Sequence, residues 1–191
     1  MSHETLTPQQ IFRKKAAGES LNPDEEQPLR RHLIAVRCNN TIGALNRVAN
    51  LFSQRGFNLD SVTVGETDDP TISRMTLATT GTTRKVEQVL LQLHNLVDTL
   101  DVDDLTGEEH VERELCLLKV RYTTESRAEI KDLLEIFRGK VVDITPHTMT
   151  FELTGPTTKV NAFIGMMPEG TVEDIVRSGR VAMRRALVHG D

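Results

Sequence analysis

A recurring series of residues constrains the fold of this chain more than any other feature of its sequence. Seven residues recur at a constant offset of 74, from Met75, Thr76, Thr80, Gly81, Thr83, Lys85 and Val86 to Met149, Thr150, Thr154, Gly155, Thr157, Lys159 and Val160. Three more recur at an offset of 83, from Arg55, Gly56 and Asp60 to Arg138, Gly139 and Asp143. Junctions between strands and helices favour Thr and Gly in any protein, so chance similarity is the alternative. We interpret the series as a structural repeat, which predicts two similar halves.

Apolar periodicity predicts the order βαββαβ in each half. In the first half, strand-like runs cover 32–37, 57–64, 72–79 and 99–103, and helical stripes comprise Leu45, Val48, Ala49 and Phe52, then Val86, Val89, Leu90, Leu93 and Val97. In the second half, strand-like runs cover 112–122, 141–145, 148–153 and 171–176, and helical stripes comprise Ile130, Leu133, Leu134 and Phe137, then Val160, Phe163, Ile164 and Met167. Gly56 is the expected end of the first helix, and Thr83 the expected N-cap of the second. The pattern predicts an α+β protein of two ferredoxin-like βαββαβ domains, each with two helices on one face of an antiparallel sheet.

The same patterns predict the domain boundaries. Residues 1–30 form an N-terminal extension and linker, residues 31–106 the first domain and residues 112–185 the second domain. Within the extension, residues 7–18 predict a short helix, which belongs either to a mobile tail or to a docking segment for a partner. Helices on one face leave the other face and the edges of each sheet uncovered. We therefore expect a two-fold homodimer that forms through the sheets.

Charge and aromatic content argue against several classes of function. The chain has 23 Lys and Arg against 28 Asp and Glu, and its net charge of −5 is unsuited to a dedicated duplex-DNA binder. Aromatic residues are only 4% of the chain, which argues against a protein that stacks single-stranded bases. No run approaches the roughly 20 apolar residues of a membrane span or resembles a secretory signal. Because Cys38 and Cys116 lie far apart, we expect no disulfide and a cytoplasmic location.

No pattern in the sequence predicts catalysis or metal binding. Nucleotide-binding glycine motifs and the His-Glu-x-x-His motif are absent. Cys116 and His94 are expected to be structural, and Cys38 has no evident His partner for nucleophilic catalysis. The acidic clusters at 68–69, 101–104 and 108–109 favour solvated faces over a cation site. The basic group of Arg177, Arg180, Arg184 and Arg185 suits a helix end or an interface better than a nucleic-acid site.

One loop carries a positive signal for binding. This loop joins a predicted strand to a predicted helix and comprises Asn40, Thr41, Ile42, Gly43, Ala44 and Leu45. N–H groups at a helix N-terminus attract anions, and Gly43 lets a ligand approach the backbone closely. Asn40 can both donate and accept hydrogen bonds, which suits a ligand that carries a carboxylate and an ammonium group, and Asn58 offers a second amide. Ordinary helix capping is the alternative interpretation of this loop.

The segments around this loop resemble a known family. Residues 39–48 and 51–61 look like an ACT domain, and more closely they resemble the regulatory small subunit of acetolactate synthase, also called acetohydroxyacid synthase. Further matching runs lie at 67–76, 92–98, 110–114, 135–139 and 175–180, so the resemblance spans both halves, from about residue 31 to residue 185. Residues 1–30 lie outside the pattern.

The resemblance implies an N-terminal ACT domain, a C-terminal regulatory-subunit domain and no active site in this chain. In the family, a large catalytic subunit carries thiamine diphosphate, a divalent metal and FAD, and condenses pyruvate with a second 2-oxo acid in branched-chain amino-acid synthesis. The small subunit raises that activity and confers feedback inhibition, commonly by valine. The resemblance thus implies a catalytic partner, a homodimer and L-valine as the allosteric effector.

The resemblance also implies where the effector binds, namely between two ACT domains of a dimer. One wall of this site is formed by Asn40, Thr41, Ile42, Gly43, Ala44 and Leu45 of one subunit. The opposite wall is formed by Asn58 and Leu59 of the other subunit. The choice among valine, leucine and isoleucine stays open. The principal alternative is a stand-alone ACT-type amino-acid sensor that acts on another enzyme. A small enzyme on the same scaffold and a dimerisation module without a ligand are further alternatives.

Overall fold

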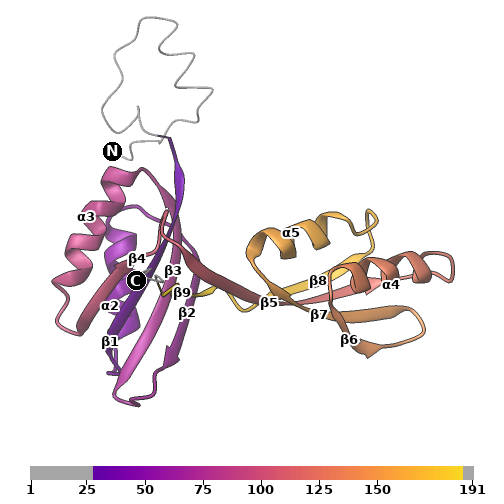
Figure 1. Cartoon of the computed structure of the whole chain (residues 1–191), viewed down its shortest axis with the longest axis horizontal. Coiled ribbons are helices and arrows are strands. Elements are labelled where there is room, and N and C mark those ends of the chain that lie inside the picture. Colours follow the sequence, from indigo (N-terminus) through magenta and orange to yellow (C-terminus); the bar gives the residue numbers. More distant parts are fainter. Residues whose placement is uncertain (1–27, 187–191) are drawn as a thin grey trace, which may run out of the picture. The chain divides into compact units, whose positions relative to one another are not determined.

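A computed structural model of the chain describes residues 28–186, and the helix predicted at residues 7–18 lies outside them. The described chain divides into two compact units. One comprises residues 28–109 with 184–186, and the other comprises His110–Met183. Each unit is an antiparallel sheet with two helices (Figure 1). This confirms the predicted α+β fold.

The first unit has the strand order β2-β3-β1-β4. Its strands are β1 (Arg30–Asn39), β2 (Leu59–Glu66), β3 (Ile72–Gly81) and β4 (Thr99–Asp104), and its helices are α2 (Ala44–Gln54) and α3 (Thr83–His94). β1 pairs with both β3 and β4, and β2 pairs with β3, all of them antiparallel. Because β2 pairs with β3 alone, it forms one edge of the described sheet.

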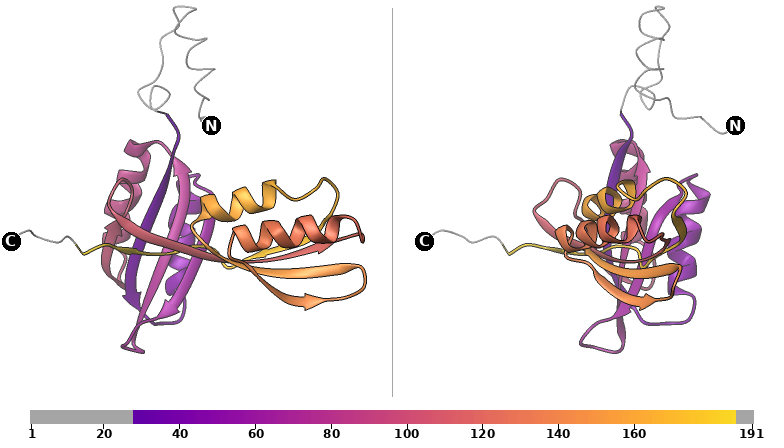
Figure 2. Two further views of the ribbon diagram at one scale, coloured as in Figure 1. Left: turned by 45° about the vertical axis from the view of Figure 1, so that its right-hand side comes forward. Right: turned by 90° about the vertical axis from the view of Figure 1, so that its right-hand side faces the viewer.

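The second unit repeats this topology with the order β6-β7-β5-β8. Its strands are β5 (His110–Arg121), β6 (Lys140–Ile144), β7 (Thr148–Gly155) and β8 (Val172–Arg177), and its helices are α4 (Ser126–Ile136) and α5 (Thr157–Gly165). A further short strand, β9 (Val181–Arg184), pairs with β5 and was not predicted. Figure 2 shows α4 and α5 on the same face of this sheet.

Each sheet packs one face against its two helices to form a hydrophobic core. In the first unit, Ile34 and Val36 of β1 meet Phe52 of α2 and Val89 of α3 in one buried cluster. In the second unit, the corresponding cluster comprises Leu118, Val120, Ile130, Leu134, Met149, Phe151, Val160 and Phe163. Each fully buried side chain of this size contributes about 1.5–3 kcal/mol. Most residues of the predicted helical stripes therefore supply the two cores, whereas Leu45, at the start of the first stripe, is exposed.

The ends of α2 and α4 revise the alignment of the repeat. After α2, the N–H of Phe57 bonds the carbonyl of Phe52 at 2.9 Å, and Gly56 is left-handed with φ 72°. After α4, the N–H of Gly139 bonds the carbonyl of Leu134 at 2.9 Å, and the left-handed residue is Arg138 with φ 53°. Gly56 thus corresponds to Arg138, and the helix ends align at an offset of 82 rather than 83.

Several local predictions are wrong. Val97 is 84% exposed because α3 ends at His94, before the apolar period reaches it. The N-cap of α3 is Thr82 rather than Thr83, and its side chain makes no capping hydrogen bond. The face of the sheet away from the helices was predicted to be uncovered. However, Leu33 and Ile34 of β1 point to opposite faces and both are buried, so the centre of the sheet is covered on both sides.

The basic residues near the C-terminal end of the described chain do not mark a helix end. Arg177 belongs to β8 and pairs with the buried carboxylate of Glu114. Arg184 belongs to β9 and bonds Asp103 at 2.5 Å and Glu108 at 3.1 Å. These arginines join strand and linker segments by ion pairs, and two of the acidic residues predicted to be merely solvated are their partners.

Candidate functional site

The loop at residues 40–43 joins β1 to α2 and is anchored on both sides. The N–H of Asn39 donates to the carbonyl of Asp98 at 2.8 Å, and the N–H of Asn40 donates to the carbonyl of Thr71 at 2.7 Å. The side-chain amide of Asn40 donates to the carbonyl of Pro70 at 3.0 Å. Asn40 therefore fixes the loop against the turn between β2 and β3.

At the start of α2, several backbone N–H groups donate to no acceptor in the described chain. Gly43 is the N-cap, with φ 86°, and it has no side chain that could cap the helix. Within residues 28–186, the N–H groups of Ile42, Gly43 and Leu45 donate to no acceptor. The first turn of α2 also contains no acidic residue. Donors at a helix N-terminus with no internal acceptor are suited to binding a carboxylate.

A cation lies beside these donors. The guanidinium of Arg47 pairs with the carboxylate of Asp98, and its Nη2 approaches the carbonyl of Ile42 at 3.3 Å. A Cβ atom placed on Gly43 would lie 2.9 Å from Nη1 of Arg47. Thr41 completes the group, since its hydroxyl donates to Asp98 at 3.0 Å. Arg47 and Asp98 thus add fixed charges of both signs to the edge of the loop.

The other side of the loop offers apolar surface. The side chain of Ile42 is 101% exposed, so it contacts nothing within the described chain. Leu45 is also exposed, whereas Ala44 is buried beneath the loop. Exposed aliphatic groups next to carboxylate-binding donors suit a small amphipathic ligand such as an aliphatic amino acid.

The equivalent loop of the second unit lacks this arrangement. It begins in the same way, because the N–H of Arg121 bonds the carbonyl of Thr171 at 2.7 Å, as Asn39 does with Asp98. However, Thr123 and Ser126 cap each other, with the N–H of Ser126 donating to the Thr123 hydroxyl at 3.3 Å and the N–H of Thr123 donating to the Ser126 hydroxyl at 3.0 Å. The N-cap is Glu125, a carboxylate whose pKa is lowered by its hydrogen bond with the Thr123 hydroxyl. A helix start that is capped and acidic in this way is unfavourable for an anion, so of the two described loops the one in the first unit is better suited to binding an anion.

Asn58 and Leu59 lie at the other end of the sheet from this loop. Leu59 pairs with Thr79, whereas Glu66, next to Asn40, pairs with Ser73. Their partners Ser73 and Thr79 are six positions apart along β3, which corresponds to about 20 Å in an extended strand. One chain therefore brings residues 40–45 together but does not bring Asn58 and Leu59 to them.

Among the described residues, the cysteines and histidines do not form a reactive group. Cys38 is buried next to the loop, its thiol donates to the carbonyl of Ser73 at 3.7 Å, and burial followed by the negative charge of Asp98 raises its pKa. Cys116 is also buried, and its pKa is raised mainly by burial. His94 is exposed at the end of α3. In the part of the chain that the structure describes, no three His, Cys, Asp or Glu residues converge as metal ligands, and no helix is long and apolar enough to cross a membrane.

Sequence reasoning found the loop but missed two of its charged residues. Arg47 lies four residues after Gly43, which is one helical turn along α2. This spacing could have predicted that the Arg47 side chain lies beside Gly43. Asp98 is 51 positions from Arg47, and no local pattern indicates their contact.

Comparisons with known proteins show the family to which the chain belongs. Residues 34–101 match a family model described as the AHAS small subunit-like ACT domain, and residues 113–186 match one described as the small subunit of acetolactate synthase. The chain is 49% identical over 156 residues to an acetolactate synthase small subunit of Haemophilus influenzae, covering 81% of this chain and 96% of that protein. It is 47% identical over 179 residues to that of Aquifex aeolicus, covering 91% and 93%.

A solved structure is similar over the same region. The acetolactate synthase small subunit of Thermotoga maritima shares 42% sequence identity and a TM-score of 0.76, covering 83% of this chain and 99% of that one. The first unit, with its strand-to-helix loop, is therefore an ACT domain. The whole chain belongs to the acetolactate synthase small-subunit family.

Proposed function

We propose that this chain is the regulatory subunit of an acetolactate synthase. It activates a thiamine-diphosphate-dependent catalytic subunit and confers feedback inhibition by a branched-chain amino acid, with L-valine as the first expectation. The proposal is supported by family membership over both units and by the relatives, which are themselves small subunits of the enzyme. The chain is expected to have no catalytic site of its own and to act in branched-chain amino-acid biosynthesis.

The observation that carries the effector site is the row of unbonded donors at the start of α2. A carboxylate of the effector accepts hydrogen bonds from the N–H groups of Ile42, Gly43 and Leu45. Its ammonium is placed near the side-chain oxygen of Asn40 and the carboxylate of Glu66, which lies 3.4 Å from the Asn40 amide nitrogen. The aliphatic side chain then lies against Ile42, which is otherwise exposed.

The second wall of the site requires another copy of the chain. β2 is an edge strand, and an antiparallel pairing with its own copy about its centre places Leu59 of one chain opposite Glu66 of the other. Since Glu66 adjoins Asn40, this pairing brings Asn58 and Leu59 of the second copy to the loop. It joins two residue groups that one chain keeps at opposite ends of the sheet.

Effector binding between two copies gives a route to regulation. Valine binds the arrangement in which both walls are in place more tightly than any arrangement in which they are apart. It can shift the equilibrium only by that difference in affinity. The catalytic subunit then responds to the arrangement that valine stabilises, and the second unit either transmits the state or contacts the catalytic subunit.

The substitution Gly43→Asp tests the site. It places a carboxylate beside the Arg47 guanidinium, in the region where the effector carboxylate binds. We expect activation of the catalytic subunit to persist and valine inhibition to be lost. Gly170→Asp is the matched control, because Gly170 is also left-handed, with φ 73°, and has no atom within 4 Å of its added Cβ. Valine inhibition that persists in Gly43→Asp would refute the site assignment.

A pull-down separates this proposal from a stand-alone sensor that uses the same site. The full chain is mixed with a thiamine-dependent acetolactate synthase catalytic subunit, and co-purification and stimulated acetolactate formation are measured. Valine binding without either response would favour the sensor.

A further inference from the structure

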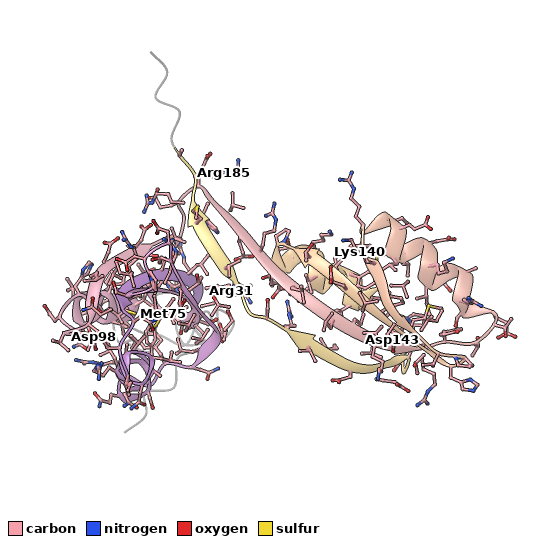
Figure 3. The ribbon with its side chains drawn as sticks, turned by 90° about the horizontal axis from the view of Figure 1, so that it is seen from below. Arg31, Met75, Asp98, Lys140, Asp143 and Arg185 are labelled. Carbon is pink, nitrogen blue, oxygen red and sulfur yellow. The ribbon has the colours of Figure 1, made fainter. Side chains whose placement is uncertain are left out.

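An acidic side chain lies beside the loop that is proposed to bind a carboxylate. Asp98, labelled in Figure 3, is in the segment between α3 and β4, and its side chain is only 15% exposed. Its carboxylate accepts a hydrogen bond from the Thr41 hydroxyl at 3.0 Å, and its backbone carbonyl accepts one from the N–H of Asn39 at 2.8 Å. Asp98 therefore holds the loop in place, but a negative charge fixed there opposes a second carboxylate nearby.

Arg47 is placed to cancel this charge. Two nitrogens of its guanidinium, Nε and Nη2, contact the Asp98 carboxylate. The third, Nη1, lies toward Gly43, since a Cβ atom built on Gly43 would be 2.9 Å from Nη1 and 3.9 Å from Nη2. Within residues 28–186, the hydrogen bonds of the guanidinium come from Nε and Nη2 alone. The guanidinium thus neutralises Asp98 along one edge and keeps its remaining nitrogen beside the start of α2.

The repeat provides an internal comparison for this ion pair. With the helix ends aligned at an offset of 82, Arg47 corresponds to Glu129, in the first turn of α4. Asp98 corresponds to Thr171, because their carbonyls accept the N–H of the last residue of β1 and of β5, respectively. The acid and the arginine that neutralises it therefore occur together at the loop with unbonded donors, whereas the internally capped loop has neither at the equivalent positions.

We propose that Arg47 determines the affinity of the loop for the effector carboxylate, and that it does so by neutralising Asp98. Without the guanidinium, the effector carboxylate and Asp98 are two like charges in one site. With it, the charges of the pair cancel, and the N–H donors of the loop attract an anion. Arg47 is thus a positioning residue that acts through Asp98. This role rests on the proposed effector site and adds to it the residue that makes an acidic surrounding compatible with an acidic ligand.

Substitutions of Arg47 test this role in calorimetric titrations of the full chain with L-valine. Arg47→Met removes the charge, keeps the aliphatic part of the side chain, and should weaken L-valine binding about tenfold or more. Arg47→Lys keeps the charge and should stay within about threefold of the unmodified chain. Arg55→Met is the matched control, because it removes a charge at the other end of α2, where Arg55 bonds Gln92 at 3.0 Å. It should leave the affinity unchanged.

A double variant separates neutralisation from every other role of Arg47. Asp98→Asn removes the negative charge, and the new amide oxygen can still accept the hydrogen bond from the Thr41 hydroxyl. Arg47→Met combined with Asp98→Asn should therefore recover L-valine binding to within about threefold of the unmodified chain. A double variant that binds as weakly as Arg47→Met alone would overturn the proposal, because Arg47 would then act as a ligand or through packing. An Arg47→Lys variant as weak as Arg47→Met would overturn it too.

Ionic strength provides a readout that a purely structural role would not change. The Debye length falls from about 10 Å at 0.1 M salt to about 3 Å at 1 M, so the loss caused by Arg47→Met should shrink severalfold over this range. Arg55→Met serves as the control at both salt concentrations. An equal loss at low and high salt would count against the proposal.

The unmodified chain distinguishes this proposal from the proposed function. If it binds no L-valine, the effector site itself is wrong, and the role of Arg47 is overturned with it. If it binds L-valine and Arg47→Met binds equally well, the effector site stands and only the role of Arg47 is overturned.

Discussion

Arg138 holds a left-handed conformation at the end of α4, and its replacement by glycine should stabilise the second unit. Its φ of 53° is the only positive φ of a non-glycine residue in the described chain, and the equivalent residue in the first unit is Gly56. The left-handed region costs a residue with a Cβ atom about 1–2 kcal/mol, and the greater freedom of glycine in the unfolded chain offsets about 0.4–1 kcal/mol of the relief. We expect Arg138→Gly to increase the free energy of unfolding by about 0.5–1 kcal/mol.

Chemical denaturation of the full chain, followed by a probe in the second unit, measures this change. Arg138→Ala is the matched control, because it removes the guanidinium and keeps the Cβ atom, so it should give little of the gain. Gly56→Ala should show the opposite sign in the first unit, since a Cβ added there meets no atom within 4 Å and only the backbone strain remains. If Arg138→Ala stabilises as much as Arg138→Gly, the effect comes from the side chain and the argument from backbone conformation is wrong.

Three further predictions concern buried hydroxyls, thiols and one turn. Among residues 28–186, the buried hydroxyls of Thr82 and Thr157 have no hydrogen-bond partner, so replacing either by Val should stabilise the chain by about 1 kcal/mol in denaturant titrations. Because burial raises the pKa of Cys38, its thiol should resist a disulfide reagent at neutral pH until the protein unfolds, and rapid labelling of the native chain would contradict its burial. Hydrogen bonds from the Thr71 hydroxyl and N–H lower the pKa of Asp69, so its contribution to the turn is present above its unfolded pKa and is lost as pH falls through the folded value. An NMR titration of the Asp69 carboxyl should therefore give a midpoint below that of an unstructured Asp, with the Thr71 amide shifting in the same step.

The sequence predicted the elements that follow simple periodicity. Val48 with Phe52 and Val86 with Val89 face the core of the first unit because their spacing matches one side of a helix. Val97 follows the same period but is exposed, since the period cannot indicate that α3 ends at His94. Apolar spacing thus locates a helix face better than it locates a helix end.

The strand β9 could not be predicted from its residues. Its four positions, 181–184, include one buried residue, Ala182, and two of them are the exposed Val181 and Met183. Such a short, exposed segment lacks a strand pattern, and it is a strand because it pairs with β5. The pairing is a long-range contact that local sequence does not encode.

The backbone features of the loop at residues 40–43 were predictable where local chemistry defines them, whereas its role in binding stays a prediction. Gly43 at a helix start and the neighbouring Asn40 indicate an anion-binding loop, and the structure shows the unbonded donors. The ion pair between Arg47 and Asp98 depends on the packing of α2 beside the segment between α3 and β4, so it became visible only with the fold. The position of Asn58 and Leu59 at the loop depends on a second copy and stays a prediction.

Complementation between two variants tests most directly whether the effector site lies between two copies. Gly43→Asp damages the loop, and Asn58→Ala damages the opposite wall, so neither variant alone should bind L-valine in calorimetric titrations. A mixed dimer contains one site with both defects and one intact site, and random pairing of equal amounts should restore about a quarter of the native number of sites. Recovery of L-valine binding on mixing, with D-valine as the inactive control, is the predicted result. Titrations of the mixture that show no more binding than the separate variants would contradict a site shared between two chains.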